Sequence, residues 1–326
     1  MFDGLRLDHV NLGAVTLRVR YGGTGAPVVL LHGHPRTHTT WYAVVPRLAE
    51  HHVVVVPDLR GYGGSSLPPD EPDHAQSSKR AMAGDLVSLM ARLGHERFAV
   101  AGHDRGALVA FRAAMDHPDR VTRLVVMDGL PVIEHLERTD ARFARAWWHW
   151  WFLGQTDKPA ERVICVDPDA WYRIPGPDRI GAGNHADIVA ALRDPAVVHG
   201  MCEDYRAGLG IDRDHDEADR VAGRQVACPT MLLEAAHDDL DIHGDPAAIW
   251  APWLARPLRH RTIACGHHQA EEAPNEVTEA LLEFLAVPGV ASVAAPESRP
   301  SGSSSRHRCR RASAWPTARR GGRHPG

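Results

Sequence analysis

The chain has 326 residues, of which 44% are hydrophobic and 24% charged, so it can bury a large core and is not globally disordered. No stretch approaches the roughly 18 consecutive apolar residues that a membrane-spanning helix needs, and the N-terminus lacks the pattern of a secretory signal. The five cysteines are scattered without C-x-x-C spacing, which argues against a disulfide framework and a zinc site. We therefore expect a cytoplasmic protein with reduced thiols and no membrane partner.

The C-terminal segment, residues 288–326, differs in composition from the rest of the chain. It contains eight Arg and one Glu and is rich in Pro, Gly and Ser, whereas the net charge of the whole chain is -4. The remainder is therefore acidic, and an acidic body without a basic face argues against binding to nucleic acid. We predict that residues 288–326 form a disordered basic tail.

Strand-like and helix-like segments alternate along the chain before this tail. The alternating segment at 16–21 predicts an antiparallel edge hairpin, and the apolar spacing at 78–93 predicts an amphipathic helix. Buried strands are predicted at 28–31, 53–56, 98–101, 124–127, 231–234 and 261–264. This order is typical of an α/β protein with a mostly parallel sheet and helices on both faces.

The alternation breaks between residues 131 and 221, where the sequence becomes aromatic and helical. A segment of this length between two strands is too long for a loop and must carry its own structure. We therefore predict a core in two parts, residues 1–130 and 222–287, with a helical cap at 131–221 inserted after the sixth strand.

The strongest chemical motif is Gly102-His103-Asp104-Arg105-Gly106, which joins a predicted strand to a predicted helix and fits G-x-Nuc-x-G. A sharp strand-to-helix turn crowds its neighbours, so glycines on both sides relieve contacts that side chains would make. Such a turn raises the central residue above the sheet, which makes Asp104 the candidate nucleophile. A structural alternative is that Asp104 only caps the helix.

Two further loops follow predicted strands and complete a catalytic set. The turn after strand 28–31 brings the backbone N–H of His34 into position to form an oxyanion hole with the N–H of Arg105. His267 follows the last strand on a Gly-led loop and is the candidate base. The acid that orients His267 is either Asp128, directly after strand 124–127, or Asp238, after strand 231–234, and we favour Asp128.

These motifs, in this order and with a cap at this point, resemble the α/β-hydrolase fold over residues 16–286. An Asp nucleophile separates the chain from Ser esterases, and the closest resemblance is to the fluoroacetate (haloacetate) dehalogenases. The segments that carry it are G-H-D-R-G at 102–106, V-M-D at 126–128, W-H-W at 148–150, D-P-D at 167–169 and H-G-M-C-E-D-Y-R-A at 199–207.

The resemblance implies roles for individual residues. In that family an Asp attacks the carbon that bears the halogen, Arg residues hold the substrate carboxylate, and cap side chains bind the leaving halide. By resemblance, Arg105 binds the carboxylate and His149, Trp150 and Tyr205 bind the halide, since each can donate a hydrogen bond. The chain departs from the family at Leu108, where a second Arg is expected, and the sequence does not show whether Arg36 or Arg112 replaces it.

The nucleophile limits the chemistry. A carboxylate that attacked an ester would form a high-energy anhydride, whereas attack on a saturated carbon bearing a halide forms a stable alkyl ester of Asp104. We therefore expect a hydrolytic dehalogenase acting on a small 2-halo acid and water, without a metal or organic cofactor. A homodimer is compatible with the sequence.

Two other functions stay open at this point. An epoxide hydrolase shares the Asp nucleophile but needs acids from the cap, commonly a pair of tyrosines, for which Tyr172 and Tyr205 are the candidates. The third hypothesis is a hydrolase-fold binding protein without catalytic activity. Leu108 and the unusual tail favour it, whereas the intact set of Asp104, His267 and Asp128 argues against it.

Overall fold

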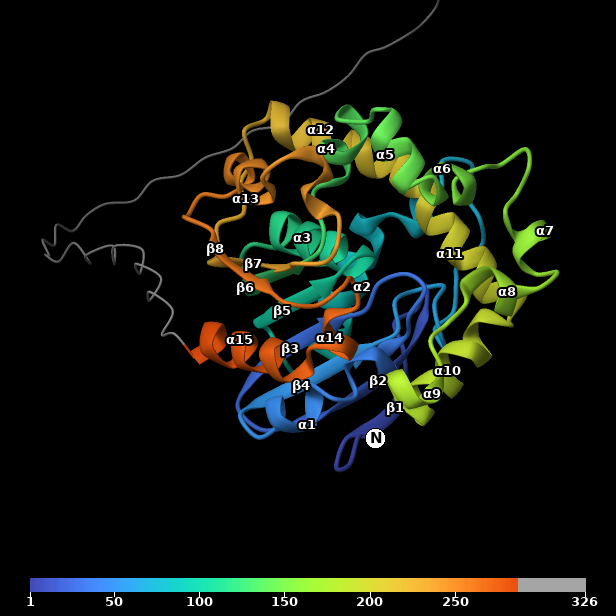
Figure 1. The fold of residues 1–326 in the computed structure, drawn as a ribbon. Coiled ribbons are helices and arrows are strands. Elements are labelled where there is room, and N and C mark those ends of the chain that lie inside the picture. The colour runs from blue at the N-terminus through green and yellow to red at the C-terminus, as the bar shows by residue number, and fades with distance from the viewer. Residues whose placement is uncertain (287–326) are drawn as a thin grey trace, which may run out of the picture. The chain divides into compact units, whose positions relative to one another are not determined.

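A mixed eight-stranded sheet forms the centre of the computed structural model, which describes residues 1–286 (Figure 1). The tail predicted at 288–326 lies outside these residues. The strands are β1 (Arg6–Asn11), β2 (Thr16–Gly23), β3 (Ala26–Leu31), β4 (His52–Pro57), β5 (Phe98–His103), β6 (Val121–Met127), β7 (Thr230–Ala235) and β8 (Arg259–Ile263). They are ordered β1-β2-β4-β3-β5-β6-β7-β8. β1 and β2 pair antiparallel at one edge and the other strands run parallel, so the predicted strands and edge hairpin are confirmed.

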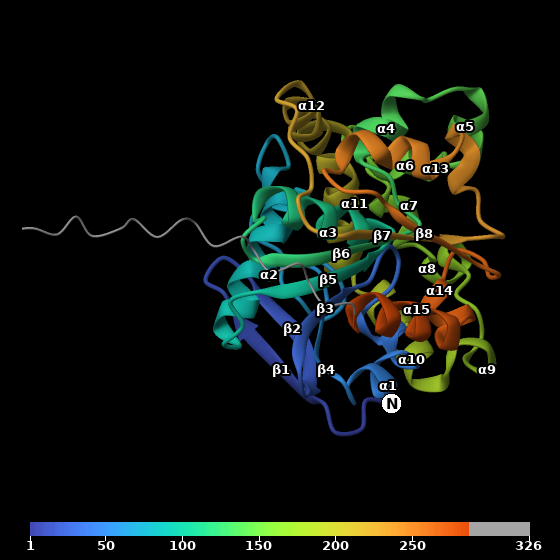
Figure 2. The ribbon, with the colours of Figure 1, turned by 90° about the vertical axis from the view of Figure 1, so that its left-hand side faces the viewer.

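Helices cover both faces of the sheet, because successive strand residues point to opposite sides. In β3, Val29 and Leu31 pack with α2 (Lys79–Arg92) and α3 (Arg105–Asp116), whereas Val28 and Leu30 pack on the opposite face. That second face is covered by α1 (Val45–Leu48), α14 (Gln269–Glu272) and α15 (Pro274–Ala286). Figure 2 shows α2 and α3 on one side of the sheet and α1 and α15 on the other. No helix of the described part of the chain is long and apolar enough to cross a bilayer.

A helical insertion follows β6, as predicted, and the chain returns to the sheet at β7. Its helices are α4 (Val132–Glu137), α5 (Ala141–Ala146), α6 (His149–Leu153), α7 (Glu161–Ile164), α8 (Pro168–Tyr172), α9 (Pro177–Ile180), α10 (Ala182–Leu192), α11 (Pro195–Ala207), a π-helical turn (Gly208–Asp212) and α12 (Arg213–Val221). After β7 the chain forms α13 (Pro246–Trp250) before β8. In Figure 1 the insertion runs from α4 and α12 along one side of the sheet to α9.

The register of the parallel strands brings their carboxyl ends to one edge. His103 pairs with Met127, Met127 with Leu233, and Ala235 with Ile263. The loops after β5, β6, β7 and β8 therefore meet at this edge, which is where ligands bind in open α/β sheets.

Candidate active site

Asp104 occupies a sharp turn between β5 and α3. Its backbone has φ 51° and ψ -120°, a positive φ that non-glycine residues rarely adopt and that costs of order 1–3 kcal/mol. A Cβ on Gly102 would overlap the carbonyl of Gly106, and one on Gly106 would overlap the carbonyl of His32. The flanking glycines are therefore required for the turn that carries Asp104.

The two carboxylate oxygens of Asp104 have different surroundings. Oδ1 accepts a hydrogen bond from the backbone N–H of His34 at 2.7 Å, and any side chain on Gly33 would collide with this carboxylate. Oδ2 faces Nε2 of His267 at 4.0 Å, and the Asp104 side chain stays 12% exposed. Within residues 1–286 the N–H of Arg105, the second predicted oxyanion donor, makes no hydrogen bond to this carboxylate. One oxygen of Asp104 is therefore fixed by a backbone hydrogen bond, and the other makes no hydrogen bond within residues 1–286.

His267 makes its short hydrogen bond to Asp238 rather than to Asp128. Nδ1 lies 2.7 Å from Oδ2 of Asp238 and 3.9 Å from Oδ2 of Asp128. In this structure Asp238, rather than the favoured Asp128, therefore makes the short contact with the imidazole. Burial opposes the charged imidazole, but the Asp238 hydrogen bond and the charge of Asp104 raise the pKa of His267 to about 9.

Asp128 directly follows β6 and divides its carboxylate between the backbone of β7 and the side of the His267 ring. Its backbone has a positive φ of 45°, and its Oδ1 accepts a hydrogen bond from the N–H of Ala235 in β7 at 2.9 Å. Its Oδ2 is buried without a hydrogen-bond partner. Burial raises the pKa of Asp128 to about 7, although the charge of His267 works in the opposite direction.

The three cap residues assigned to the halide lie together near Asp104. The Tyr205 ring of α11 lies 5.9 Å from the His149 ring and 6.1 Å from the Trp150 ring, both of α6. Nε1 of Trp150 is buried without a partner. Burial lowers the pKa of His149 to about 4 and raises that of Tyr205, and the charge of Asp104 acts on both. All three side chains are therefore uncharged at neutral pH and can donate hydrogen bonds.

The Arg105 side chain is largely occupied by the cap. Its Nε lies 2.9 Å from Oδ2 of Asp204, and its Nη2 donates to the Asp204 carbonyl at 2.9 Å. The guanidinium also lies over the Tyr205 ring, 4.2 Å from the centroid. Nη1 is buried without a hydrogen-bond partner, so the described chain uses neither of its two N–H bonds.

Neither candidate for a second carboxylate-binding Arg is free. Arg36 forms an ion pair with Glu271 at 2.9 Å, and Arg112 is bound to Asp216 and Asp219. Leu108 is buried and lines a void of about 10 Å³ with Arg112 and Lys79. The ammonium of Lys79 contacts Asp204, so the second cation of this buried cluster comes from α2 rather than from α3.

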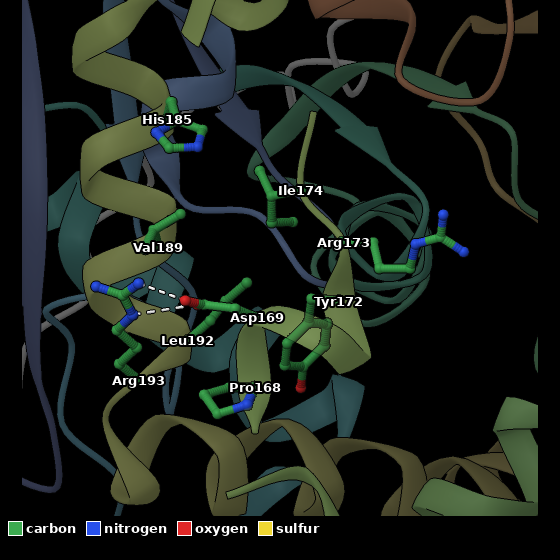
Figure 3. Close-up of a pocket in the computed structure, with 9 residues that line it drawn as sticks. All are labelled: Pro168, Asp169, Tyr172, Arg173, Ile174, His185, Val189, Leu192 and Arg193. Carbon is green, nitrogen blue, oxygen red and sulfur yellow. Dashed lines mark hydrogen bonds and ion pairs between the residues drawn. The ribbon is translucent and has the colours of Figure 1, made fainter. Parts of the chain in front are cut away.

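A pocket of about 220 Å³ lies between α8 and α10 of the cap (Figure 3). Figure 3 shows Tyr172 on one wall and the ion pair between Asp169 and Arg193 on the other. The Tyr172 ring also lies 5.7 Å from the His34 ring, and its hydroxyl is buried without a partner. Tyr172 therefore borders this pocket and also lies close to His34.

The sequence analysis missed several residues of the site. His103 and His268 flank the catalytic set, and each lies next to a predicted catalytic residue in the sequence. Asp204 lies in the segment 199–207 that carries the resemblance but was given no role, and only the folded chain brings it to Arg105 and to Lys79.

Comparison with known proteins identifies the family. Residues 26–274 match the family model described as the alpha/beta hydrolase fold. The chain belongs to the α/β hydrolase family. This hydrolase is 41% identical to a fluoroacetate dehalogenase of Burkholderia sp, over 87% of this chain and 95% of that protein. It is 30% identical to a soluble epoxide hydrolase of Corynebacterium sp. (strain C12), over 88% of this chain and 96% of that protein.

A solved structure supports the same assignment. A protein of Nostoc sp PCC 7120 assigned to the α/β hydrolases superposes with a TM-score of 0.85 at 38% identity, covering 88% of this chain and 100% of that one. The predicted fold and the predicted resemblance are confirmed by these comparisons. They relate this α/β hydrolase to both dehalogenases and epoxide hydrolases.

Proposed function

We propose that this α/β hydrolase is a dehalogenase that cleaves the carbon–halogen bond of a small 2-halo acid. Oδ2 of Asp104 attacks the carbon, an alkyl ester forms on Asp104, and the halide leaves with the bonding electron pair. His267 then takes a proton from water, and the resulting hydroxide adds to the ester carbonyl. When this tetrahedral adduct collapses, the leaving alkoxide takes the proton from His267 to form the hydroxy acid, and the regenerated Asp104 carboxyl gives its proton to solvent. These two steps use side chains, a backbone N–H and water.

The observation that carries this proposal is the unequal environment of the Asp104 oxygens. Oδ1 accepts the His34 N–H at 2.7 Å, so it is the oxygen that can become the oxyanion when water attacks the ester. Oδ2 faces the His267 ring at 4.0 Å and is the oxygen left for nucleophilic attack. Asp238 holds Nδ1 of His267, so Nε2 is the nitrogen that can accept the proton of water.

The cap supplies the surroundings that a departing halide needs. Fluoride is a poor leaving group, and hydrogen bonds to a charged acceptor contribute about 1.5–3 kcal/mol each. His149, Trp150 and Tyr205 are uncharged donors grouped near Asp104. The 41% identity to a fluoroacetate dehalogenase supports the same substrate class.

Recognition of the substrate carboxylate rests on Arg105. Its uncommitted Nη1 has two N–H donors, of which we count one charged hydrogen bond to the carboxylate. Leu108 stands where the family has a second Arg and adds none. A single such bond is worth about 1.5–3 kcal/mol, which corresponds to roughly 10- to 150-fold in kcat/KM. We therefore expect chloroacetate to be preferred over chloroacetamide, which has the same C–Cl bond and no carboxylate, by a factor in this range.

A single turnover in ¹⁸O-water tests the mechanism. With enzyme in excess over chloroacetate, ¹⁸O should enter the Asp104 carboxyl, read by mass spectrometry of the peptide, while the product hydroxy acid stays unlabelled. Label confined to the product would contradict the covalent route. Chloroacetate bound without release of chloride would instead favour a binding protein.

Epoxide hydrolysis is a second candidate, favoured by the two cap tyrosines. The rings of Tyr172 and Tyr205 lie 5.7 and 5.2 Å from the His34 ring, so both approach the oxyanion loop. A tyrosine pair can protonate the oxygen of an opening epoxide. Styrene oxide and chloroacetate, offered to the same preparation, separate the two functions by diol formation and chloride release, and a higher kcat/KM for the epoxide would overturn the first proposal.

A further inference from the structure

Three imidazole rings surround one point next to the nucleophile. The ring centroids of His103, His267 and His268 are separated by 4.6 Å, 5.1 Å and 5.8 Å. One ring nitrogen from each lies within 4.8 Å of the other two. Nitrogen ligands of a tetrahedral Zn²⁺ site, with Zn–N bonds of about 2.0–2.1 Å, stand about 3.3 Å apart, so small side-chain shifts would bring these nitrogens to ligand distances.

Two of these rings have nitrogens that nothing else uses. Nε2 of His103 and Nδ1 of His268 are buried without hydrogen-bond partners in the described chain. Leaving a buried polar atom unpaired is costly, and such atoms are few in folded proteins. His267 has one nitrogen held by Asp238 at 2.7 Å, which resembles the carboxylate–histidine–metal arrangement that orients imidazole ligands.

A second cluster of ligand-type residues lacks this feature. Asp70, His199 and Glu203 also bring ligand atoms within 4.8 Å of one another. However, both nitrogens of His199 already bind carboxylates, Glu161 at 2.9 Å and Asp70 at 3.0 Å. The unpaired nitrogens of His103 and His268 therefore favour a metal site at the cluster next to Asp104. His199, whose nitrogens are both paired, provides a matched control.

We propose that His103, His267 and His268 bind a divalent transition-metal ion such as Zn²⁺ and that this ion reversibly inhibits the enzyme. Imidazole is a preferred ligand of Zn²⁺, Cu²⁺ and Ni²⁺, and three histidines leave a coordination position for water. Because Asp238 holds Nδ1 of His267, the nitrogen left for the ion is Nε2, the one that would accept a proton from water. The binding site stands on its own geometry, whereas the inhibition rests on the proposed function.

Binding is tested with Co²⁺ on the full chain, because tetrahedral Co²⁺ shows visible d–d absorption. All variants carry Cys165→Ser and Cys309→Ser, so that these thiolates do not contribute to coordination. The parent protein, with all three histidines intact, should give a Co²⁺ absorption that saturates and that disappears when Zn²⁺ displaces the Co²⁺. His268→Phe should weaken Co²⁺ binding at least 10-fold. Removing only a residue that hydrogen-bonds to a metal ligand already lowers affinity 10- to 100-fold, and loss of the ligand itself should cost no less.

The control variant is His199→Ala, which should bind Co²⁺ as the parent does. If His199→Ala loses the spectrum, or if His268→Phe keeps it, the proposal is wrong. His268→Gln provides a second removal of the ligand if the Phe variant does not fold, as judged by circular dichroism.

Inhibition is measured as chloride release from chloroacetate with increasing Zn²⁺. Turnover should fall in the parent, return on addition of EDTA, and require at least 10-fold more Zn²⁺ for the same loss in His268→Phe. Equal sensitivity of the parent and His268→Phe would overturn the inhibitory role. If no variant releases chloride at any Zn²⁺ concentration, the proposed function fails, while the Co²⁺ spectrum still decides the metal site.

Discussion

His267 and Asp238 form the short contact of the catalytic set, 2.7 Å from Nδ1 to Oδ2. This bond fixes which nitrogen of the imidazole faces Asp104. The proposed order of the set along the chain is therefore nucleophile after β5, acid after β7 and base after β8. The position after β6 is filled by Asp128, whose carboxylate turns toward the backbone of β7.

Replacement of the two acids should separate their roles. Asp238→Asn removes the charge that orients His267 and supports its positive form during water attack, so ester hydrolysis should fall by roughly 10²- to 10⁴-fold. Attack by Asp104 does not need the base, so this variant should still release one equivalent of halide per enzyme in a burst. Asp128→Asn should reduce kcat less than tenfold. Rapid-quench measurement of halide release tests both, and a larger loss in Asp128→Asn would restore Asp128 as the orienting acid.

The same Asp128→Asn variant should change the pH dependence of stability. The folded protein holds the Asp128 pKa at about 7, above the ordinary 3.8 of the unfolded chain. Between these values the folded state binds more protons, so this group lowers the free energy of unfolding as pH rises from about 4 to 7. The stability of Asp128→Asn relative to the parent should therefore increase with pH across this window. Urea unfolding at several pH values measures the difference, and a constant difference would contradict the raised pKa.

The limits of sequence analysis are visible in Asp128 and Arg105. The alternation of strand-like and helix-like segments predicted the sheet, because buried strands appear in the sequence as short apolar runs. The spacing of glycines predicted the turn at Asp104, because only small residues fit there. Asp128 and Asp238 both follow strands that end at the same edge. Which carboxylate reaches His267 depends on the direction of each loop. The positive φ of Asp128 sets that direction, and the amino-acid sequence does not predict it.

Arg105 shows a second limit. Its position beside the nucleophile predicted a substrate contact, yet most of its guanidinium binds Asp204 of α11. That partner lies 99 residues further along the chain in the cap, within the segment 199–207, whose sequence does not show that this acid is buried against Arg105. The packing of the cap on the core decides such a contact, and no local pattern reports it.

Neutralising Asp104 should lower the pKa of His267. Burial works against the protonated imidazole, and the Asp238 hydrogen bond together with the charge of Asp104 brings the pKa to about 9. Asp104→Asn removes one of these charges and imitates the neutral ester of the covalent intermediate. The pKa of His267 should then move toward its ordinary value of 6.5, which would make it a competent base at neutral pH once the ester has formed. NMR titration of ¹⁵N-histidine tests this, with the exposed Asp241→Asn as a control that should leave the pKa unchanged.

The buried charge of Asp204 should make a large contribution to stability. Its carboxylate binds Nε of Arg105 at 2.9 Å, the hydroxyl of Tyr62 at 2.7 Å and the ammonium of Lys79. Burial disfavours the charged carboxyl, but the two cations keep the pKa of Asp204 below its ordinary value. Asp204→Asn would leave Arg105 and Lys79 without their shared partner in the interior, and removing one member of a buried ion pair costs about 3–5 kcal/mol.

Denaturant unfolding followed by tryptophan fluorescence measures this loss. The matched control is Asp169→Asn, which breaks the exposed ion pair with Arg193 and should leave the free energy of unfolding unchanged, since water screens such pairs. A loss in Asp204→Asn no larger than that of the control would mean that Asp212, which also contacts Lys79 at 3.2 Å, neutralises the cluster alone. Because Asp204 also holds Arg105, the residue proposed to bind the substrate carboxylate, the variant should bind chloroacetate more weakly, read as a higher KM than in the control.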